Sequence, residues 1–319
     1  MKHTRLLTCA VAGAIALALP VGVMAADFPS RGLEFVAGYT PGGGHDIMLR
    51  TMAKIIQEGK IVAVPITVVN KPGGAGAVSL GYLNGHKGDG HFLMASTSSF
   101  VTTPLTSNIG LNYKNFTPIA RLGIDPELLL VNAQSNLKSL KDIAAAGKVL
   151  NVGGTGKGGI EQIVTVLFAK ALGKKLNYIP FQSDGEVVTA LLSNHVDFIV
   201  SNPGSAGEFI KTKQFVALAI STETRSQTLP DVPTFKEQGY DITLSLFRGV
   251  VAAGDIGAAE KKYLAEMVRK LSETDEWKKS YLEKNRVEPA FLGPDEYAAF
   301  LADMNEVYRT SLTELGIIK

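Results

Sequence analysis

The chain has 319 residues, of which 45% are hydrophobic and 19% are charged, and its formal net charge is +2. This length suits two domains of ordinary size or one large one, and the near-neutral charge argues against nucleic acid or an anionic membrane surface as a partner. A single cysteine, Cys9, excludes an internal disulfide framework.

The first residues have the pattern of a secretory signal peptide. Lys2 and Arg5 precede an apolar run from Leu6 to about Val23, and small residues follow where a signal peptidase would cut. We therefore predict a signal peptide over residues 1–25, with an uncleaved anchor as the alternative. Its removal would take away two basic residues, no acidic residue and Cys9, which leaves a formal net charge of zero.

The mature chain then alternates short apolar strands with helical stretches. We predict strands at Leu33–Gly38, Ile66–Asn70 and His91–Ser96, and an amphipathic helix at Asp46–Glu58. The glycine turn NKPGGAGA opens a further helix. This βαβ rhythm is typical of a mostly parallel sheet that is covered on both faces.

The same rhythm starts again near residue 127. Strands are predicted where the sequence reads ELLLVN, VLNVGG, LNYIPF, VDFIVSN, FVALAIS and LFRGVVAA, and helices at Ser139–Ala146, Ile160–Leu172 and Glu186–Asn194. The stretch LPDVPTFKEQGYDI holds one short helix at most, and the end of the chain reads as helical. Two sets of elements predict two α/β lobes, and ligands of such sheets collect beyond the carboxyl ends of the strands.

The first candidate site is the turn TPGGGHD, between a predicted strand and a predicted helix. Three consecutive glycines exceed what one turn needs, and a strand–turn–helix passage directs free backbone N–H groups at one spot, which suits a carboxylate or a phosphate. The spacing matches neither a P-loop nor a dinucleotide-binding turn. Asp46 can cap the helix or hold the amides of the loop, and His45 can act as a neutral donor or as a partner for a ligand carboxylate. The competing interpretation is a tight turn that only redirects the chain.

The second candidate is NVGGTGKGGIEQ, which again lies between a strand and a helix. A flexible turn is the alternative, but two such turns in one exported chain favour a paired cradle. Thr97, Ser98 and Ser99 follow the third strand, and their hydroxyls either face a ligand or cap a helix.

Catalysis has little support in the sequence. There is no G-x-S-x-G elbow and no H-x-x-x-H pair, and the predicted mature chain has no cysteine, so neither a serine hydrolase nor a zinc site is favoured. We predict a binding protein without cofactor or metal. A secreted α/β hydrolase or lyase acting on a small carboxylate is the alternative.

Several stretches together carry a family resemblance: FVAGYTPGGGHDIMLR, ITVVNKPGGAGAVSLGYL, KGDGHFLMASTSS, NFTPIARL, LNYIPFQSDGEVVTALLSNHVDFIVSN and ALAISTETRSQTLPDVPTFKEQGYDI. In this order they resemble the periplasmic substrate-binding receptors of tripartite tricarboxylate transporters, the Bug family, over essentially the whole mature chain. The resemblance implies an α/β, two-lobed periplasmic binding protein of Venus-flytrap, type II-like form, with a ligand cleft between the lobes. Residues 26–125 and 247–319 would form the first lobe and residues 126–246 the second.

The same resemblance implies a function. The protein would be a periplasmic monomer that delivers a small mono-, di- or tricarboxylate to a membrane permease with one large and one small subunit. Carried over by position, the ligand-binding residues in the first lobe would be Tyr39, Pro41, Gly42, Gly43, Gly44, His45, Asp46, Thr97, Ser98 and Arg248. Those in the second lobe would be Gly154, Thr155, Gly156, Lys157, Gly158, Phe181, Asp184 and Asn202.

Two departures from the family pattern affect the expected ligand. His45 stands where the family often has Thr or Ser, and Ser183 and Asp184 stand where the citrate-like branch tends to have glycines. The charge of Asp184 would disfavour a third carboxylate or bind an amino group, unless Asp184 only caps a helix and faces solvent. Protonation of His45 would strengthen anion binding as the pH falls through about 6.5. At Gly43 we expect both the backbone conformation and the approach of the ligand to require glycine.

Overall fold

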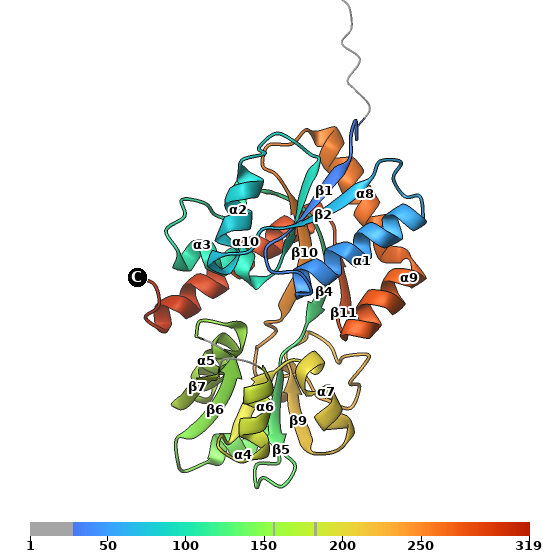
Figure 1. The fold of residues 1–319 in the computed structure, drawn as a ribbon. Helices are drawn as coiled ribbons and strands as arrows, with labels where there is room; N and C mark the ends of the chain where they lie inside the picture. Colours follow the sequence, from blue (N-terminus) through green and yellow to red (C-terminus); the bar gives the residue numbers. More distant parts are fainter. Residues whose placement is uncertain (1–27, 156, 182–183) are drawn as a thin grey trace, which may run out of the picture.

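The protein is described from a computed structural model, which covers residues 28–155, 157–181 and 184–319. The signal peptide predicted at residues 1–25, Gly156 and Ser183 lie outside these residues. Two separate β-sheets each form the centre of one lobe, and Figure 1 shows the two lobes one above the other.

The first lobe is built on a sheet of six strands in the order β11-β4-β10-β3-β1-β2. Its strands are β1 (Leu33–Ala37), β2 (Ile66–Asn70), β3 (Phe92–Ser96), β4 (Thr117–Asp125), β10 (Leu246–Ala252) and β11 (Glu288–Leu292). Its helices are α1 (Gly44–Glu58), α2 (Ala77–Asn84), α3 (Ser98–Thr106), α8 (Ala258–Glu273), α9 (Asp275–Trp277) and α10 (Pro294–Glu314).

The second lobe is built on a sheet of five strands in the order β7-β6-β8-β5-β9. Its strands are β5 (Leu128–Asn132), β6 (Leu150–Thr155), β7 (Leu176–Phe181), β8 (Phe198–Ser201) and β9 (Phe215–Ile220). Its helices are α4 (Leu140–Ala145), α5 (Ile160–Leu172), α6 (Asp184–Leu192) and α7 (Pro203–Lys211). Within the described residues, no helix has the length and apolarity needed to cross a membrane.

The prediction of a mostly parallel sheet was wrong, because both sheets are mixed. β1 pairs in parallel with β2 and β3, whereas β10 is antiparallel to both β3 and β4. In the second sheet β6 is parallel to β7 and β8, whereas β5 is antiparallel to β8 and β9. The reason is topological: β4 takes the chain out of the first lobe and β10 brings it back, so these two strands run in opposite directions.

Apolar packing continues from one lobe into the other. α1 buries Met48, Leu49 and Met52 on one stripe against its sheet. A second cluster of buried residues includes Phe247 of the first lobe together with Phe168 of the second. Burying a side chain of this size contributes about 1.5–3 kcal/mol, so the region where the chain crosses is part of the folded core.

Backbone hydrogen bonds also fix the crossing segments to each other. The N–H of Ser221 donates to the carbonyl of Glu127 at 2.9 Å, and the N–H of Glu127 donates to the Ser221 hydroxyl at 2.8 Å. The Ser245 hydroxyl donates to the Ser221 carbonyl at 3.1 Å. The position of Glu127 between the lobes is therefore set by its own backbone.

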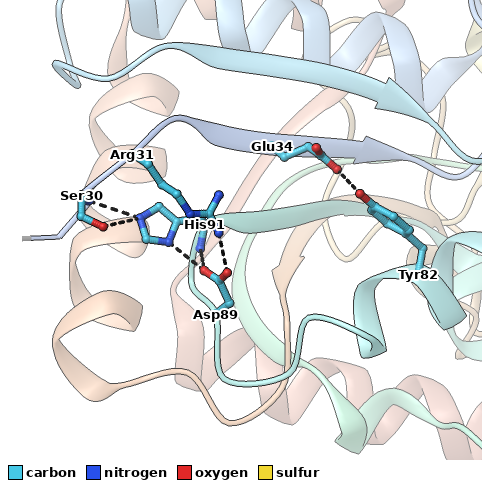
Figure 2. Close-up of polar contacts among 6 residues, drawn as sticks. All are labelled: Ser30, Arg31, Glu34, Tyr82, Asp89 and His91. Atoms are coloured by element: carbon cyan, nitrogen blue, oxygen red, sulfur yellow. Dashed lines mark hydrogen bonds and ion pairs between the residues drawn. The ribbon is translucent and has the colours of Figure 1, made fainter.

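A polar cluster at the beginning of β1 and β3 is shown in Figure 2. His91 accepts the N–H of Ser30 at Nε2 (3.2 Å), so its proton lies on Nδ1, which is 2.7 Å from Asp89 Oδ1. Arg31 pairs with the other oxygen of Asp89 at 2.5 Å. Both ring nitrogens of His91 therefore have hydrogen-bond partners. The cluster lies at the starts of β1 and β3, and the glycine turn lies at the other end of β1, so the role of His91 is structural.

Gly249 provides a test of the packing between β10 and α10. A Cβ atom added there would lie 2.5 Å from the hydroxyl of Tyr297, which is hydrogen-bonded to Ser96. We expect Gly249→Ala to lower the free energy of unfolding by about 1–3 kcal/mol, measured by urea unfolding. An added Cβ at Gly81 in α2 has no neighbour within 4 Å, so Gly81→Ala should stabilise by about 0.5–1 kcal/mol. Equal stability of both variants would contradict this packing.

Candidate functional site

The three glycines after β1 serve different purposes. Gly42 has φ +81°, a conformation that favours glycine, whereas Gly43 is the extended N-cap of α1 with φ −77°. The expectation that the backbone conformation at Gly43 requires glycine was therefore wrong. Pro41, Gly42 and Gly44 are exposed, so the start of α1 is accessible.

Gly44 is required because of its neighbour. A Cβ atom at this position would lie 2.6 Å from Nη1 of Arg248. Arg248 also donates from Nε to Asp125 Oδ2 at 2.9 Å, and its Nη2 contacts the same oxygen. The Asp125 ion pair thus fixes the guanidinium beside the first residue of a fifteen-residue helix.

Asp46 holds the loop. Its buried carboxylate accepts the N–H of Gly42, Nε of Arg50 and Nδ2 of Asn70, each at 2.9 Å. The hydrogen bond from Arg50 is the main reason that the pKa of Asp46 is lowered to about 2. Asp46 therefore stays ionised, and both of its carboxylate oxygens already have hydrogen-bond partners. This agrees with the interpretation that Asp46 holds the amides of the loop.

His45 lies beneath the same turn as a neutral imidazole. Its Nδ1 accepts the N–H of Gly38 at 3.3 Å, so the proton lies on Nε2, which is 3.1 Å from the Thr97 hydroxyl. Burial and, next, the charge of Arg248 lower the pKa of His45 to about 4. The expectation of a protonation step near pH 6.5 was therefore wrong, since it assumed an exposed ring.

Two of the remaining predicted residues of this lobe, Tyr39 and Thr97, contact His45. The ring of Tyr39 meets His45 edge-on with ring centroids 4.7 Å apart, and its hydroxyl donates to the carbonyl of Ala75. Thr97 occupies the N-cap position of α3 but makes no side-chain cap bond, and its hydroxyl lies between His45 and Ser99. The hydroxyl of Ser98 accepts from Tyr308 at 2.9 Å.

In the second lobe the glycine turn joins β6 to α5. Gly158 has φ +72°, and its N–H donates to Gln162 Oε1 at 2.7 Å. An added Cβ there would lie 3.2 Å from Ile317, so this part of the turn packs against the end of the chain. At Gly154 a Cβ would lie 2.6 Å from the hydroxyl of Tyr178, and Lys157 is exposed.

Asp184 joins three elements of this lobe. Its oxygens accept from the hydroxyls of Thr155 at 2.8 Å and Ser205 at 2.7 Å, although it is also the first residue of α6. Asn202 caps α7 by accepting the N–H of Ser205 at 3.0 Å. Phe181, at the end of β7, packs beside Gly153. Asp184 is thus held in place by its neighbours instead of facing solvent as a simple cap.

Sequence reasoning did not identify two buried acids where the lobes meet. Glu127 is 1% exposed, and its Oε2 has no hydrogen-bond partner among the described residues. Burial, and then the charges of Glu161, Asp125 and Asp184, raise its pKa. Glu161, 9% exposed in the first turn of α5, has its pKa raised to about 7, mainly by burial. Glu127 directly precedes the apolar run LLLV, and Glu161 follows Ile160 at the start of a largely apolar helix. A charged residue at such a position is the sequence signal that could have identified both acids.

A cavity of about 540 Å³ lies apart from the predicted ligand-binding residues and is lined by Arg121, Phe300 and the segment 221–227, among others. Arg121 donates to the carbonyl of Ala290 at 2.9 Å, and its guanidinium lies 4.5 Å from the ring centroid of Phe300. None of the predicted ligand residues lines this cavity.

The comparisons with known proteins agree with this fold. The protein-family model described as the tripartite tricarboxylate transporter family receptor matches residues 49–317 of this chain. A protein of Cupriavidus necator, described as the UPF0065 protein in the gbd 5' region, is 28% identical over 95% of this chain and 93% of its own length. Protein BugT of Bordetella pertussis is 27% identical over 99% of both chains.

Solved structures give the same fold. A TctC solute-binding protein from Polaromonas, solved without ligand, has a TM-score of 0.84 and 25% identity over 90% of this chain and 99% of its own. MatC of Rhodopseudomonas palustris, solved with malate, has a TM-score of 0.67 and 22% identity over 89% and 100% of the two chains. A further R. palustris protein, solved with adipate, has a TM-score of 0.72 and 20% identity over 92% and 99%.

Gly44→Ala tests the position of Arg248. The added methyl group should displace the guanidinium and lower the affinity for a carboxylate by roughly tenfold or more. The carboxylate to use is the one that stabilises the parent protein most, and the affinity is measured by calorimetry. Gly147 has open space around it, so Gly147→Ala is the matched control. Parent-like affinity in Gly44→Ala would show that Arg248 does not face the ligand.

His45 should remain neutral between pH 7 and 5. Because its folded pKa of about 4 lies below the ordinary 6.5, the folded state binds fewer protons than the unfolded state in this window. Its contribution to stability is complete above pH 6.5 and is lost as the pH falls toward 4. NMR titration of the ring should give a midpoint near 4, and a midpoint near 6.5 with rising carboxylate affinity would refute it.

Proposed function

The chain belongs to the tripartite tricarboxylate transporter receptor family, and from this premise we propose that it binds a small organic carboxylate between its two lobes and delivers it to a membrane permease with one large and one small subunit. Members of this family are receptors, so the protein is a binding protein and not a hydrolase or lyase. We further propose that it acts in the periplasm as a monomer, after cleavage of residues 1–25.

The observation that carries the proposal is the guanidinium of Arg248 beside the exposed start of α1. A helix terminus alone contributes about 0.3–1 kcal/mol, whereas micromolar affinity requires about 8 kcal/mol. Charge-assisted hydrogen bonds contribute about 1.5–3 kcal/mol each, so three or four donors would be needed. One turn with one guanidinium supplies too few, which favours a contribution from the second lobe.

The proposed binding residues fall into two groups. In the first lobe, His45 contacts Tyr39 and Thr97, and Arg248 lies beside Gly44. The first group consists of Tyr39, Pro41, Gly42, Gly43, Gly44, His45, Asp46, Thr97, Ser98 and Arg248. In the second lobe, Asp184 accepts from the hydroxyls of Thr155 and Ser205, and the Ser205 hydroxyl also contacts Asn202. The second group consists of Gly154, Thr155, Lys157, Gly158, Phe181, Asp184 and Asn202. We propose that His45 and Asp46 act by shaping the turn, since their polar atoms already have partners.

The lobe limits remain a proposal as well. We place residues 26–125 and 247–319 in the first lobe and 126–246 in the second. The strand order supports this division, because the first sheet contains β1 to β4, β10 and β11, and the second contains β5 to β9.

A thermal-shift screen of carboxylates tests the function. At a concentration about 100 times Kd, a bound ligand stabilises by about 2.7 kcal/mol, so one group of carboxylates should raise Tm by roughly 5–10 °C. We expect citrate to raise Tm less than mono- or dicarboxylates, because Asp184 adds a negative charge. NMR of the incubated ligand should show no chemical change. A screen without any stabilising carboxylate, or turnover of a stabilising compound, would refute the proposal.

A further inference from the structure

The junction between the lobes has two regions of opposite charge. On one side Arg248 lies beside Gly44, and its charge adds to the effect of burial in lowering the pKa of His45. On the other side lie Glu127, Glu161 and Asp184. Burial and then the charges of Glu161, Asp125 and Asp184 raise the pKa of Glu127, and burial, with a further contribution from Asp184, raises that of Glu161. Asp125 lies between the two regions, paired with Arg248.

The acids differ in how they are compensated. Asp125 has Arg248, and Asp184 has the hydroxyls of Thr155 and Ser205. Because a hydroxyl carries one proton, Thr155 cannot satisfy both Asp184 and the neighbouring Glu161. Glu127 is the extreme case, since Oε2 is buried with no hydrogen-bond partner in the described part of the chain.

Glu127 cannot easily escape this position. Its N–H and carbonyl are both bonded to Ser221, so the backbone is fixed where the chain crosses. An unpaired polar group costs free energy when it is buried, and a charged one costs more. A permanently buried carboxyl oxygen without a donor therefore indicates that another molecule supplies the partner.

A metal ion is a poor candidate for that partner. No three or more His, Cys, Asp or Glu residues converge on a metal-sized site within residues 28–155, 157–181 and 184–319. An ammonium group needs only one or two carboxylates and is a hydrogen-bond donor, which is what Oε2 of Glu127 lacks among the described residues.

We propose that the ligand is an aminocarboxylate, whose carboxylate lies at the Gly42–Gly44 turn beside Arg248 and whose ammonium group lies between Glu127 and Glu161. This inference rests on the proposed function and specifies its ligand class. The two acids would attract the ammonium group of such a ligand, whereas a dicarboxylate would place its second negative charge against them.

Proton release provides an independent readout. Glu127 and Glu161 hold protons more readily than ordinary carboxyls, so an arriving ammonium group should displace protons into the buffer. Among the described residues, the titratable groups that interact with Glu127 or Glu161 are Asp125, Tyr178, Asp184 and Tyr308, and Arg248 is paired with Asp125. The pKa values of Tyr178 and Tyr308 are raised, first by burial, so both remain protonated.

The experiment compares acids of equal chain length with and without an amino group: glycine with acetate, β-alanine with propionate, and 4-aminobutyrate with butyrate. Calorimetry on the purified protein, in two buffers of different ionisation enthalpy, gives affinity and proton release together. We expect at least one amino member to bind about 10- to 100-fold more tightly than its partner and more tightly than glutarate, with release of protons.

Glu127→Gln and Glu161→Gln should each reduce this preference about tenfold or more, while affinity for the unsubstituted acid is unchanged or higher. Exposed Glu58 lies at the far end of α1, so Glu58→Gln is the matched control. The aminocarboxylate assignment is overturned if unsubstituted acids or glutarate bind at least as tightly as every amino member. It is also overturned if both variants keep the preference of the parent. Failure of every carboxylate to bind would instead overturn the proposed function itself.

Discussion

The ion pair between Arg248 and Asp125 determines how the rest of the lobe junction is arranged. Burying a guanidinium is costly, and removing one partner of such a pair typically costs about 3–5 kcal/mol, so Arg248 is held where Asp125 places it. Its third nitrogen then lies against Gly44, which explains the glycine there. Its charge, added to burial, keeps His45 neutral, and a neutral ring can accept the N–H of Gly38 while it donates to Thr97. Arg248, which lies on β10, thus influences the structure of the turn after β1.

The contacts between the lobes are strong at the centre and weak at the edges. At the centre, one apolar cluster is shared by both lobes. Within the second lobe, Glu127 and Ser221 exchange hydrogen bonds where the chain crosses. At the edges, Arg286 pairs with Glu208, and Lys170 pairs with Glu314 at the end of α10, near α5 (Figure 1). All four side chains are at least one third exposed, and such pairs contribute about 0–1 kcal/mol each. A ligand with a few kcal/mol of differential affinity is therefore enough to shift how the lobes sit on each other.

The sequence was informative where one physical cause acts alone. Apolar runs predicted β1, β2, β3 and β10 and all five strands of the second sheet, and glycine clusters indicated both turns. β4, β11, α3 and α7 were not predicted. β4 begins Thr-Pro and carries Arg121, and α3 contains Pro104 and several threonines, so local propensity opposes the structure that tertiary packing imposes. The low pKa of His45 and the missing hydrogen-bond partner of Glu127 Oε2 depend on burial and on residues distant in the sequence, which no local sequence pattern encodes.

The balance of charges decides where selectivity can arise. A chain with a formal net charge of +2 attracts anions only weakly over distances beyond a Debye length, about 8 Å at physiological ionic strength. Discrimination must then occur at short range, where Arg248 and the acids around Glu127 are shielded from water and their interactions are strong. Desolvated contacts of this kind act mainly on the dissociation rate. A receptor built in this way would accept encounters with many small anions and would retain those whose charges match both sides of the junction.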